Sequence, residues 1–203
     1  MEEKDYYKLT ENIPEIKVLL NQEKELKKEL NRVNRRLKTY SNKYKFLKII
    51  ISENVANDLL EEYVKLFFKE IGFEKVHKVG KQLRKEDLRI IKTDKIIIAE
   101  VTGSNKRTVR DSKTMQITKH LSVRKSKKEN AYALFIINHS NNVNYKKRNE
   151  HPFTENQIQY AETGKYSLVT TTELVKGFMK VKLGKMNLLE FEEKLCEFGL
   201  VKF

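Results

Sequence analysis

Apolar residues near the beginning of the chain recur alternately three and four positions apart. The ten positions of this seam are Ile16, Leu19, Glu23, Leu26, Leu30, Val33, Leu37, Tyr40, Tyr44 and Leu47, and all of them except Glu23 are apolar or Tyr. A heptad spacing kept over more than four repeats is typical of helices that supercoil around a partner helix. The pattern therefore predicts a coiled-coil helix over residues 16–47. Charged positions beside the seam form no attractive pairs in a parallel dimer, so orientation and partner stay open.

Beyond about residue 50 the period changes, and helical stretches alternate with short runs typical of strands. A helix is expected from Val55 to Ile71, where Gly72 is a common type of C-terminal breaker. Short β-type runs follow at residues 75–79, 87–92 and 95–102, the last two joined by a tight turn at Thr93–Asp94. A basic helix over residues 108–127 and a continuous apolar strand over residues 131–138 complete this region.

The last third of the chain carries helix-capping signals. Three pairs have the spacing of a capping box, in which a side chain caps the helix that it precedes: Thr154 with Gln157, Thr170 with Glu173, and Asn187 with Glu190. The first helix should end at Gly164 and the last at Gly199, with a strand over residues 166–170. The predicted order is α-β-β-β-α-β, then α-β-α-α. We expect a coiled-coil helix over residues 1–49 and an α/β domain over residues 50–203, whose helical extension covers about residues 172–203.

The chain is strongly basic. Of its 203 residues, 42 are Lys or Arg and 28 are Asp or Glu, which gives a formal net charge of +14 at pH 7. A surface this positive concentrates polyanions around itself, so nucleic acid is the leading partner class. A genome-wide bias toward Lys is the alternative source of the charge.

Composition and motifs exclude several protein classes. The single cysteine allows no intrachain disulfide, which fits a reducing cytoplasm. Without a run of 18 apolar residues or a charged-then-apolar leader, we expect a cytoplasmic protein with no membrane partner. The sequence also lacks the Gly-rich phosphate loop of P-loop ATPases, the paired cysteines of zinc ribbons and the His-Glu-x-x-His motif of zincins.

Two acidic residues at the predicted strands are candidates for chemistry. Asp87 begins one strand, and Glu100 lies within the apolar run of the next. A carboxylate in a buried strand requires compensation, because moving an unpaired charge out of water costs several kcal/mol. A divalent cation shared by Asp87 and Glu100 would supply it, since Mg²⁺ prefers oxygen ligands. Pairing of Glu100 with a Lys or Arg is the alternative.

This arrangement resembles the PD-(D/E)XK nuclease superfamily, which has the restriction-endonuclease-like fold, over about residues 50–172. The segments LEEYVKLFFKEIGF, EDLRI and IIIAEVTGS are similar, in that order, to the opening helix of Mrr-like members, to the strand with the metal-binding Asp and to the strand usually written EVKG. The resemblance implies a mixed sheet flanked by helices. It also implies that Asp87, Glu100 and the Val101 carbonyl ligate Mg²⁺ or Mn²⁺.

One catalytic position departs from the family pattern. Thr102 stands where the family has a Lys, which is thought to position the attacking water and to stabilise charge on the phosphate. Lys106, Lys113 and Lys119 are the nearby amines that would replace it. Without such a replacement, the site binds its substrate but cuts poorly.

Two helical residues complete the predicted site. Many family members use a Glu from the first helix. Here Glu61 is the better candidate, because it lies at the rim of the apolar face, whereas Glu62 lies on the solvent-exposed face. An ion pair with Lys65 is the alternative role for Glu61. Gln on the basic helix often borders the site in related nucleases, and here Gln116 shares a helix face with His120. The alternative is a surface pair.

The predicted function combines these features. The expected nucleic-acid contacts are Lys106, Lys113, Lys119, Arg124 and Arg148, with solvation of the helix or loop as the alternative. We expect a Mg²⁺- or Mn²⁺-dependent nuclease that acts on DNA in restriction, defence or DNA processing. A homodimer through the coiled coil would provide two sites for duplex cleavage. The alternatives are a catalytically degenerate nuclease fold that binds nucleic acid or a protein, and an interaction protein in which the coiled coil is the working part.

Overall fold

The chain forms two compact units, Met1–Lys45 and Phe46–Phe203. The computed structural model describes residues 13–79, 86–92, 95–149 and 151–203. The predicted turn at Thr93–Asp94 therefore lies outside the described residues. The sequence pattern predicts the boundary between the two units at residue 49, slightly later than the division of the structure.

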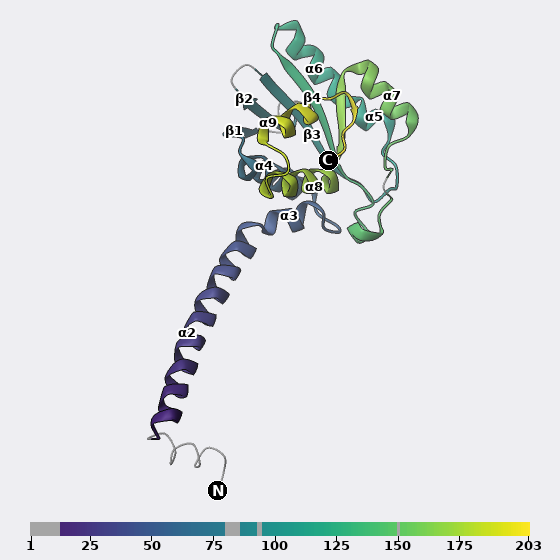
Figure 1. The fold of residues 1–203 in the computed structure, drawn as a ribbon. Coiled ribbons are helices and arrows are strands. Elements are labelled where there is room, and N and C mark those ends of the chain that lie inside the picture. Colours follow the sequence, from purple (N-terminus) through teal and green to yellow (C-terminus); the bar gives the residue numbers. More distant parts are fainter. Residues whose placement is uncertain (1–12, 80–85, 93–94, 150) are drawn as a thin grey trace. The chain divides into compact units, whose positions relative to one another are not determined.

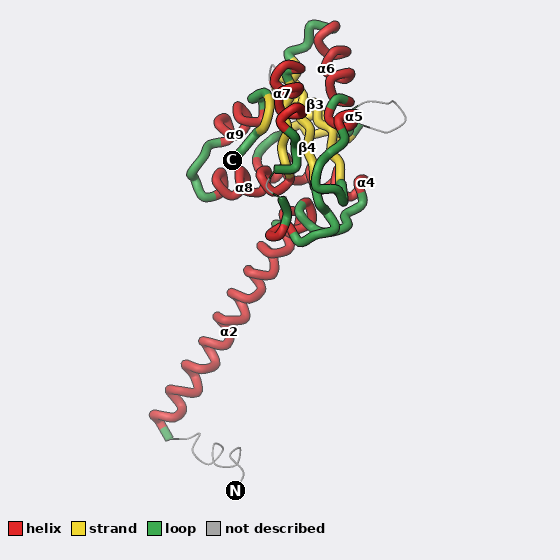
Figure 2. Tube along the Cα trace, turned by 90° about the vertical axis from the view of Figure 1, so that its right-hand side faces the viewer, coloured by secondary structure: helices red, strands yellow, loops and turns green. Residues whose placement is uncertain are grey.

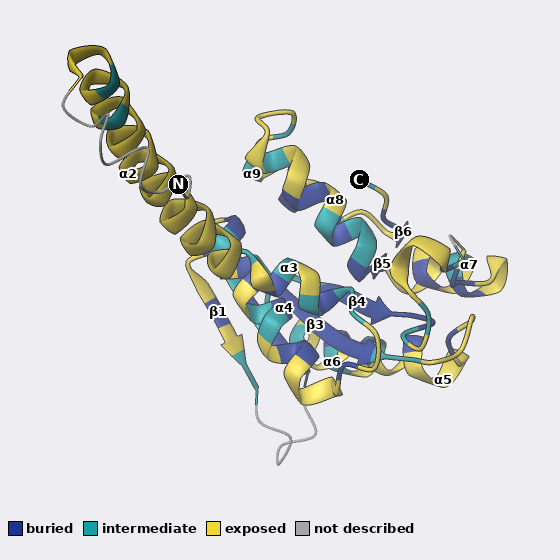
Figure 3. Ribbon diagram, turned by 90° about the horizontal axis from the view of Figure 1, so that it is seen from below, coloured by how far each residue is buried: buried dark blue, intermediate teal, exposed yellow. Residues whose placement is uncertain are grey.

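The first unit contains α2 (Pro14–Lys43), a 30-residue helix with no buried residue. Figure 3 shows its exposed surface in yellow along nearly the whole helix. The predicted single helix over residues 16–47 is wrong at its C-terminal end. Tyr44, with φ −95° and ψ 11°, interrupts it, and α3 (Lys45–Ile50) follows as a separate helix with Phe46 and Ile50 buried. Heptad spacing continues across this break, so periodicity alone does not reveal it.

The second unit is built on a mixed sheet of six strands in the order β1-β2-β3-β4-β5-β6. The strands are β1 (Lys75–Lys78), β2 (Leu88–Lys92), β3 (Lys95–Gly103), β4 (Ala131–Asn138), β5 (Tyr166–Thr170) and β6 (Gly199–Leu200). The pairs β1–β2 and β2–β3 are antiparallel, whereas β3 to β6 pair in parallel. The sequence did not indicate β6, because two residues are too few to show a period.

Helices cover both faces of this sheet (Figures 1 and 2). On one face lie α4 (Asn57–Ile71), α8 (Thr171–Lys182) and α9 (Leu188–Leu195). On the other lie α5 (Asp111–Thr114), α6 (Gln116–Ser126) and α7 (Glu155–Gly164). The predicted α/β class and the α-β-β-β-α-β order are confirmed, with two short helices in place of the second helix.

Each face of the sheet has its own apolar core. On the α4 face, the Phe67 ring lies 5.4 Å from the Phe178 ring and 6.3 Å from the Phe46 ring, measured between centroids. On the opposite face, Ile117 of α6 packs in a cluster with Ile98 of β3. Because side chains alternate along a strand, Glu100 and Thr102 point to the same face as Ile98. The register of β3 thus directs both predicted site residues toward α6.

Two predicted helices differ in their bounds. The basic stretch over residues 108–127 begins at Asp111 and is divided at Met115 into α5 and α6. The last helix ends at Leu195 rather than Gly199, because Gly199, with φ +87°, already belongs to β6. The capping signals do mark helix starts: complete capping boxes open α7 and α9, and the Thr170 side chain accepts a hydrogen bond from the N–H of Glu173 at the start of α8.

None of the helices in the described part of the chain combines the length and apolar character that a membrane crossing requires. Cys196 is a free thiol. Burial raises its pKa to about 11, so the thiol stays protonated at neutral pH.

Candidate active site

β2 and β3 bring the two predicted metal-binding carboxyl groups side by side. Leu88 pairs with Ala99 in this antiparallel ladder, so Asp87, one residue earlier, stands opposite Glu100. The N–H of Val101 donates a hydrogen bond of 2.8 Å to Asp87 Oδ2, which fixes the Asp87 side chain against β3. The role of the Val101 carbonyl as a metal ligand stays a prediction.

The Glu100 carboxyl group is buried, with 8% of the residue exposed. Burial, and then the negative charge of Asp87 and a hydrogen bond with it, raises the pKa of Glu100 to about 8. Within the described residues, Glu100 Oε1 has no hydrogen-bond partner. A buried oxygen without a partner beside a second carboxyl group is a donor set that suits a hard divalent cation.

Asp87 and Glu100 therefore fit Mg²⁺ or Mn²⁺ as a pair. The described part of the chain holds no group of three or more His, Cys, Asp or Glu residues placed to bind a metal. A cation here would take its remaining ligands from water, from the substrate or from the backbone, as Mg²⁺ commonly does.

α6 presents two polar side chains to Glu100. The amide Nε2 of Gln116 donates to Glu100 Oε2 at 3.4 Å. His120 Nε2 lies 3.2 Å from Glu100 Oε1, although neither of these two atoms makes a hydrogen bond within the described residues. Burial lowers the pKa of His120, which keeps its ring neutral near pH 7. The structure thus places both residues of the predicted helix face against one carboxyl group.

A hollow of about 450 Å³ lies at the end of β3, and Thr102, two residues along the strand from Glu100, is one of its lining residues, whereas Asp87 and Glu100 are not. Three basic residues, Lys106, Arg110 and Lys113, also line it. The charge of Lys113 acts directly on Glu100, where it lowers the pKa against the larger upward effect of burial. Of the three amines that would replace the family Lys, Lys113 is therefore the one whose charge acts on Glu100.

Glu61 is buried on α4, but its carboxylate has a cationic partner. Glu61 Oε2 lies 3.1 Å from Nζ of Lys78 on β1, and Glu62 Oε1 lies 3.3 Å from the same nitrogen. Burial acts to lower the pKa of Lys78, but its hydrogen bonds to the two carboxylates raise it overall. Lys65 pairs with Glu62 at 3.6 Å, not with Glu61. A catalytic role for Glu61 stays a prediction.

Two of the residues predicted to contact nucleic acid form hydrogen bonds with other residues of the protein. Arg124 donates to Glu86 Oε1 at 2.7 Å and to Glu129 Oε2 at 3.1 Å. Arg148 is buried, and it donates to the Ile51 carbonyl at 2.9 Å and to the side chain of Asn138. These bonds favour structural roles for both guanidinium groups. The other three predicted contacts, Lys106, Lys113 and Lys119, are exposed.

Two further residues, which the sequence pattern does not indicate, position the site. Glu86 Oε1 accepts bonds from Arg89 and Arg124, which ties the start of β2 to α6. Asn57 Oδ1 accepts a hydrogen bond of 2.8 Å from the N–H of Gly103, where an added Cβ would lie 3.1 Å from that oxygen. The acidic pair in EDLRI was the only signal for Glu86, and no local pattern marks Asn57.

A second hollow, of about 390 Å³, is lined in part by His139, Glu173 and Lys176. Glu173, the acidic lining residue among those that the structure describes, accepts a hydrogen bond from the N–H of Phe203 and pairs with Lys176 at 2.5 Å. Within the described residues the hollow has no second carboxyl group for a cation. The pair formed by Asp87 and Glu100 is therefore the stronger candidate for catalysis.

Comparison with solved structures shows similarity to restriction endonucleases. Restriction endonuclease FokI superposes with a TM-score of 0.58 at 15% identity, over 79% of this chain and 31% of FokI. FokI bound to DNA gives 0.57 at 16% identity, over 79% and 30%. The small subunit of the heterodimeric restriction endonuclease R.BspD6I gives 0.54 at 14% identity, over 76% and 86%. The chain thus spans less than a third of FokI, and its fold is restriction-endonuclease-like.

Sequence comparison adds no closer relationship: no protein-family model matches the chain, and a search of curated proteins finds no significant match.

Proposed function

We propose that the chain is a metal-dependent nuclease that hydrolyses phosphodiester bonds, with DNA as the favoured substrate. The observation that supports this most strongly is that Asp87 and the buried Glu100 stand opposite each other in a restriction-endonuclease-like fold, with Glu100 Oε1 making no hydrogen bond within the described residues. DNA is favoured because one structural neighbour was solved with DNA bound. The proposal includes a cytoplasmic role in restriction, defence or DNA processing, and a homodimer formed through α2.

Each residue has a distinct role in this proposal. Asp87 and Glu100 would hold Mg²⁺ or Mn²⁺, which when bound polarises the scissile phosphate and lowers the pKa of an attacking water. Gln116 orients the Glu100 carboxyl group through its amide. Lys113 supplies the positive charge that stabilises the phosphate as negative charge builds on it. Lys106 and Arg110 neutralise neighbouring phosphates at the hollow.

A second candidate function is a nucleic-acid-binding module that no longer cuts. The observation that favours it is Thr102, which brings no charge to the position of the family Lys. Incubation with linear, supercoiled and single-stranded DNA and with RNA, in Mg²⁺ and in Mn²⁺, separates the two. Cleavage supports the nuclease, whereas binding without cleavage of any substrate supports the module.

Metal affinity should rise with pH. Because the pKa of Glu100 is raised to about 8, the metal must displace a proton at lower pH. We expect the association constant for Mn²⁺ to increase roughly tenfold per pH unit between about pH 6 and 8, and to level off above that. Calorimetric titration of the metal-free protein at several pH values measures this. A constant affinity over that range, or the same pH slope in the Glu100→Gln variant, would contradict the assignment.

DNA affinity should fall with salt. Each phosphate that the protein neutralises contributes about −0.9 to the slope of log K against log salt on duplex DNA. Replacing Lys113 by Met should therefore reduce the slope by about one. The same change at Lys180, an exposed lysine of α8, should leave the slope unaltered. Fluorescence anisotropy without metal, between 50 and 200 mM salt, measures this slope. A DNA affinity of the native chain that does not change with salt would contradict binding through phosphate contacts.

A further inference from the structure

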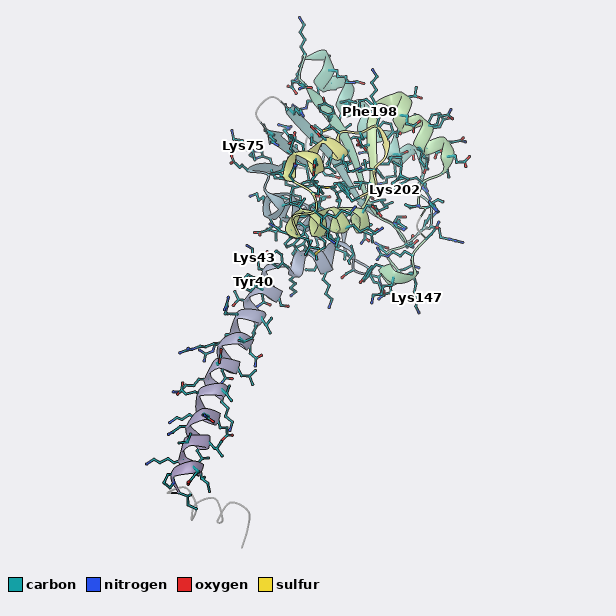
Figure 4. The ribbon with its side chains drawn as sticks, in the orientation of Figure 1. Tyr40, Lys43, Lys75, Lys147, Phe198 and Lys202 are labelled. Atoms are coloured by element: carbon teal, nitrogen blue, oxygen red, sulfur yellow. The ribbon has the colours of Figure 1, made fainter. Side chains whose placement is uncertain are left out.

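The seam of α2 is exposed along its length. Leu26, Leu30 and Leu37 are each about 60% exposed, and Val33 is 44% exposed. Figure 4 shows side chains projecting from α2 on all sides, with Tyr40 and Lys43 labelled toward its C-terminal end. An apolar stripe with heptad spacing on an exposed helix requires a covering partner. The charges of α2 indicate which partner, and in which direction it runs.

Charge is distributed unevenly along α2. The half over residues 14–29 contains four acidic and four basic residues, whereas the half over residues 30–43 contains five basic residues and no acidic one. In a parallel dimer the two basic halves would lie side by side and repel each other. In an antiparallel dimer each basic half lies beside the half of the second copy that contains the acidic residues.

Glu23 further distinguishes the antiparallel dimer from the parallel one, because it occupies the seam itself. Parallel helices in register would place the Glu23 carboxylates of the two copies against each other. An antiparallel pair centred between Leu30 and Val33 instead places Glu23 against Tyr40, whose hydroxyl group can donate to the carboxylate. A shift of one heptad would set Glu23 against Val33, with no such donor.

The same alignment pairs the remaining seam and flanking positions. Leu30 faces Val33 of the second copy, and Leu26 faces Leu37. Beside the seam, Glu29 faces Arg36 of the second copy, and the two-fold symmetry repeats this attractive pair. No like charges meet at the flanking positions in this register. We infer that α2 forms an antiparallel coiled coil with a second copy of this chain, in the register that pairs Leu26 with Leu37.

This inference gives direction and register to the homodimer of the proposed function and does not depend on catalysis. The helix C-termini would lie at opposite ends of the coil, about 45 Å apart for a helix of 30 residues. The coil would therefore attach one nuclease unit at each of its ends.

Cysteine cross-linking tests direction and register in the full chain. Cys196 is first replaced by Ser, so that introduced cysteines are the only thiols. Upon mild oxidation, the double variant Leu26→Cys/Leu37→Cys should form a covalent dimer, whereas either single variant should remain uncross-linked. Efficient cross-linking of both single variants would show a parallel coil and overturn the inference while leaving the homodimer intact. A monomeric native chain in analytical ultracentrifugation would overturn both.

A charge swap tests the flanking pair without relying on a disulfide. Arg36→Glu should weaken dimerisation by roughly tenfold, because it turns two attractive contacts into two repulsive ones. The combined variant Glu29→Arg/Arg36→Glu should restore the native dissociation constant to within about threefold. Arg35→Glu makes the same change in net charge on the outer face of the helix and serves as the matched control. Equal weakening by Arg35→Glu and Arg36→Glu, or no rescue by the combined variant, would overturn the register.

Discussion

Replacing Glu100 by Gln is expected to abolish cleavage and, in the same variant, to stabilise the metal-free protein. The amide keeps the size of the side chain but cannot serve as an anionic ligand, so cleavage should fall by at least about 10³-fold. Stability should change in the opposite direction, because the native site holds the buried Glu100 carboxyl group next to the Asp87 carboxyl group.

The gain in stability should depend on pH. Near pH 4 Glu100 is protonated in both the folded and the unfolded states, so its raised pKa has no effect. Between the ordinary pKa of Glu and the folded value of about 8, the unfolded chain loses this proton while the folded chain keeps it, and the free energy of unfolding falls as pH rises. The free energy of unfolding of the Gln variant does not fall in this way, so it should exceed that of the native chain by on the order of 2 kcal/mol at pH 8.5.

Denaturant unfolding with a chelator present, at pH 5 and pH 8.5, measures this difference. Glu74→Gln, at an exposed position shortly after α4, is the matched control and should change neither stability nor cleavage appreciably. A Glu100→Gln variant that is less stable than the native chain at pH 8.5, or one that still cuts, would show that the carboxyl group is structural.

Replacing Lys113 by Met is expected to reduce turnover by about 10²- to 10³-fold with little effect on stability. The lysine is exposed on α5, and its charge already acts on Glu100 in the free protein. A positive charge beside the reacting phosphate stabilises the transition state more than the ground state, so kcat should fall more than KM rises. Single-turnover cleavage rates at saturating DNA measure this effect.

Thr102→Lys provides the reciprocal experiment. If Lys113 already fills the role of the family Lys, a second amine at the same hollow should leave the rate unchanged or lower it through charge repulsion. Lys119→Met is the matched control, since Lys119 does not line the hollow. A large rate gain in Thr102→Lys, with no loss in Lys113→Met, would mean that the native chain lacks the catalytic amine.

Much of the fold follows from local periodicity. The continuous apolar run at residues 131–138 became a central strand, and the capping pairs at Thr154 and Asn187 opened helices where expected. These features are encoded within a few neighbouring residues. The interruption at Tyr44, by contrast, is followed by the buried residues Phe46 and Ile50, and heptad spacing carries no information about that burial.

The candidate site likewise has a part that could be predicted from the sequence and a part that could not. An acidic residue opening β2 and another inside β3 could be assigned to one site because antiparallel pairing places them opposite each other. The ion pair of Glu61 with Lys78 and the internal bonds of Arg148 join residues distant in sequence. Helix-face position marked Glu61 as catalytic and residue type marked Arg148 as a nucleic-acid contact, but neither shows these partners, since a buried and an exposed guanidinium group look the same in a sequence.

The most direct test of the central claim is cleavage of supercoiled plasmid DNA by the native chain and by Glu100→Gln at pH 8. We expect nicked or linear DNA with the native chain in Mg²⁺ or Mn²⁺, none after addition of a chelator, and none with the variant under any condition. Intact plasmid with the native chain in both metals, together with calorimetry showing no Mn²⁺ uptake that depends on Asp87 and Glu100, would contradict it.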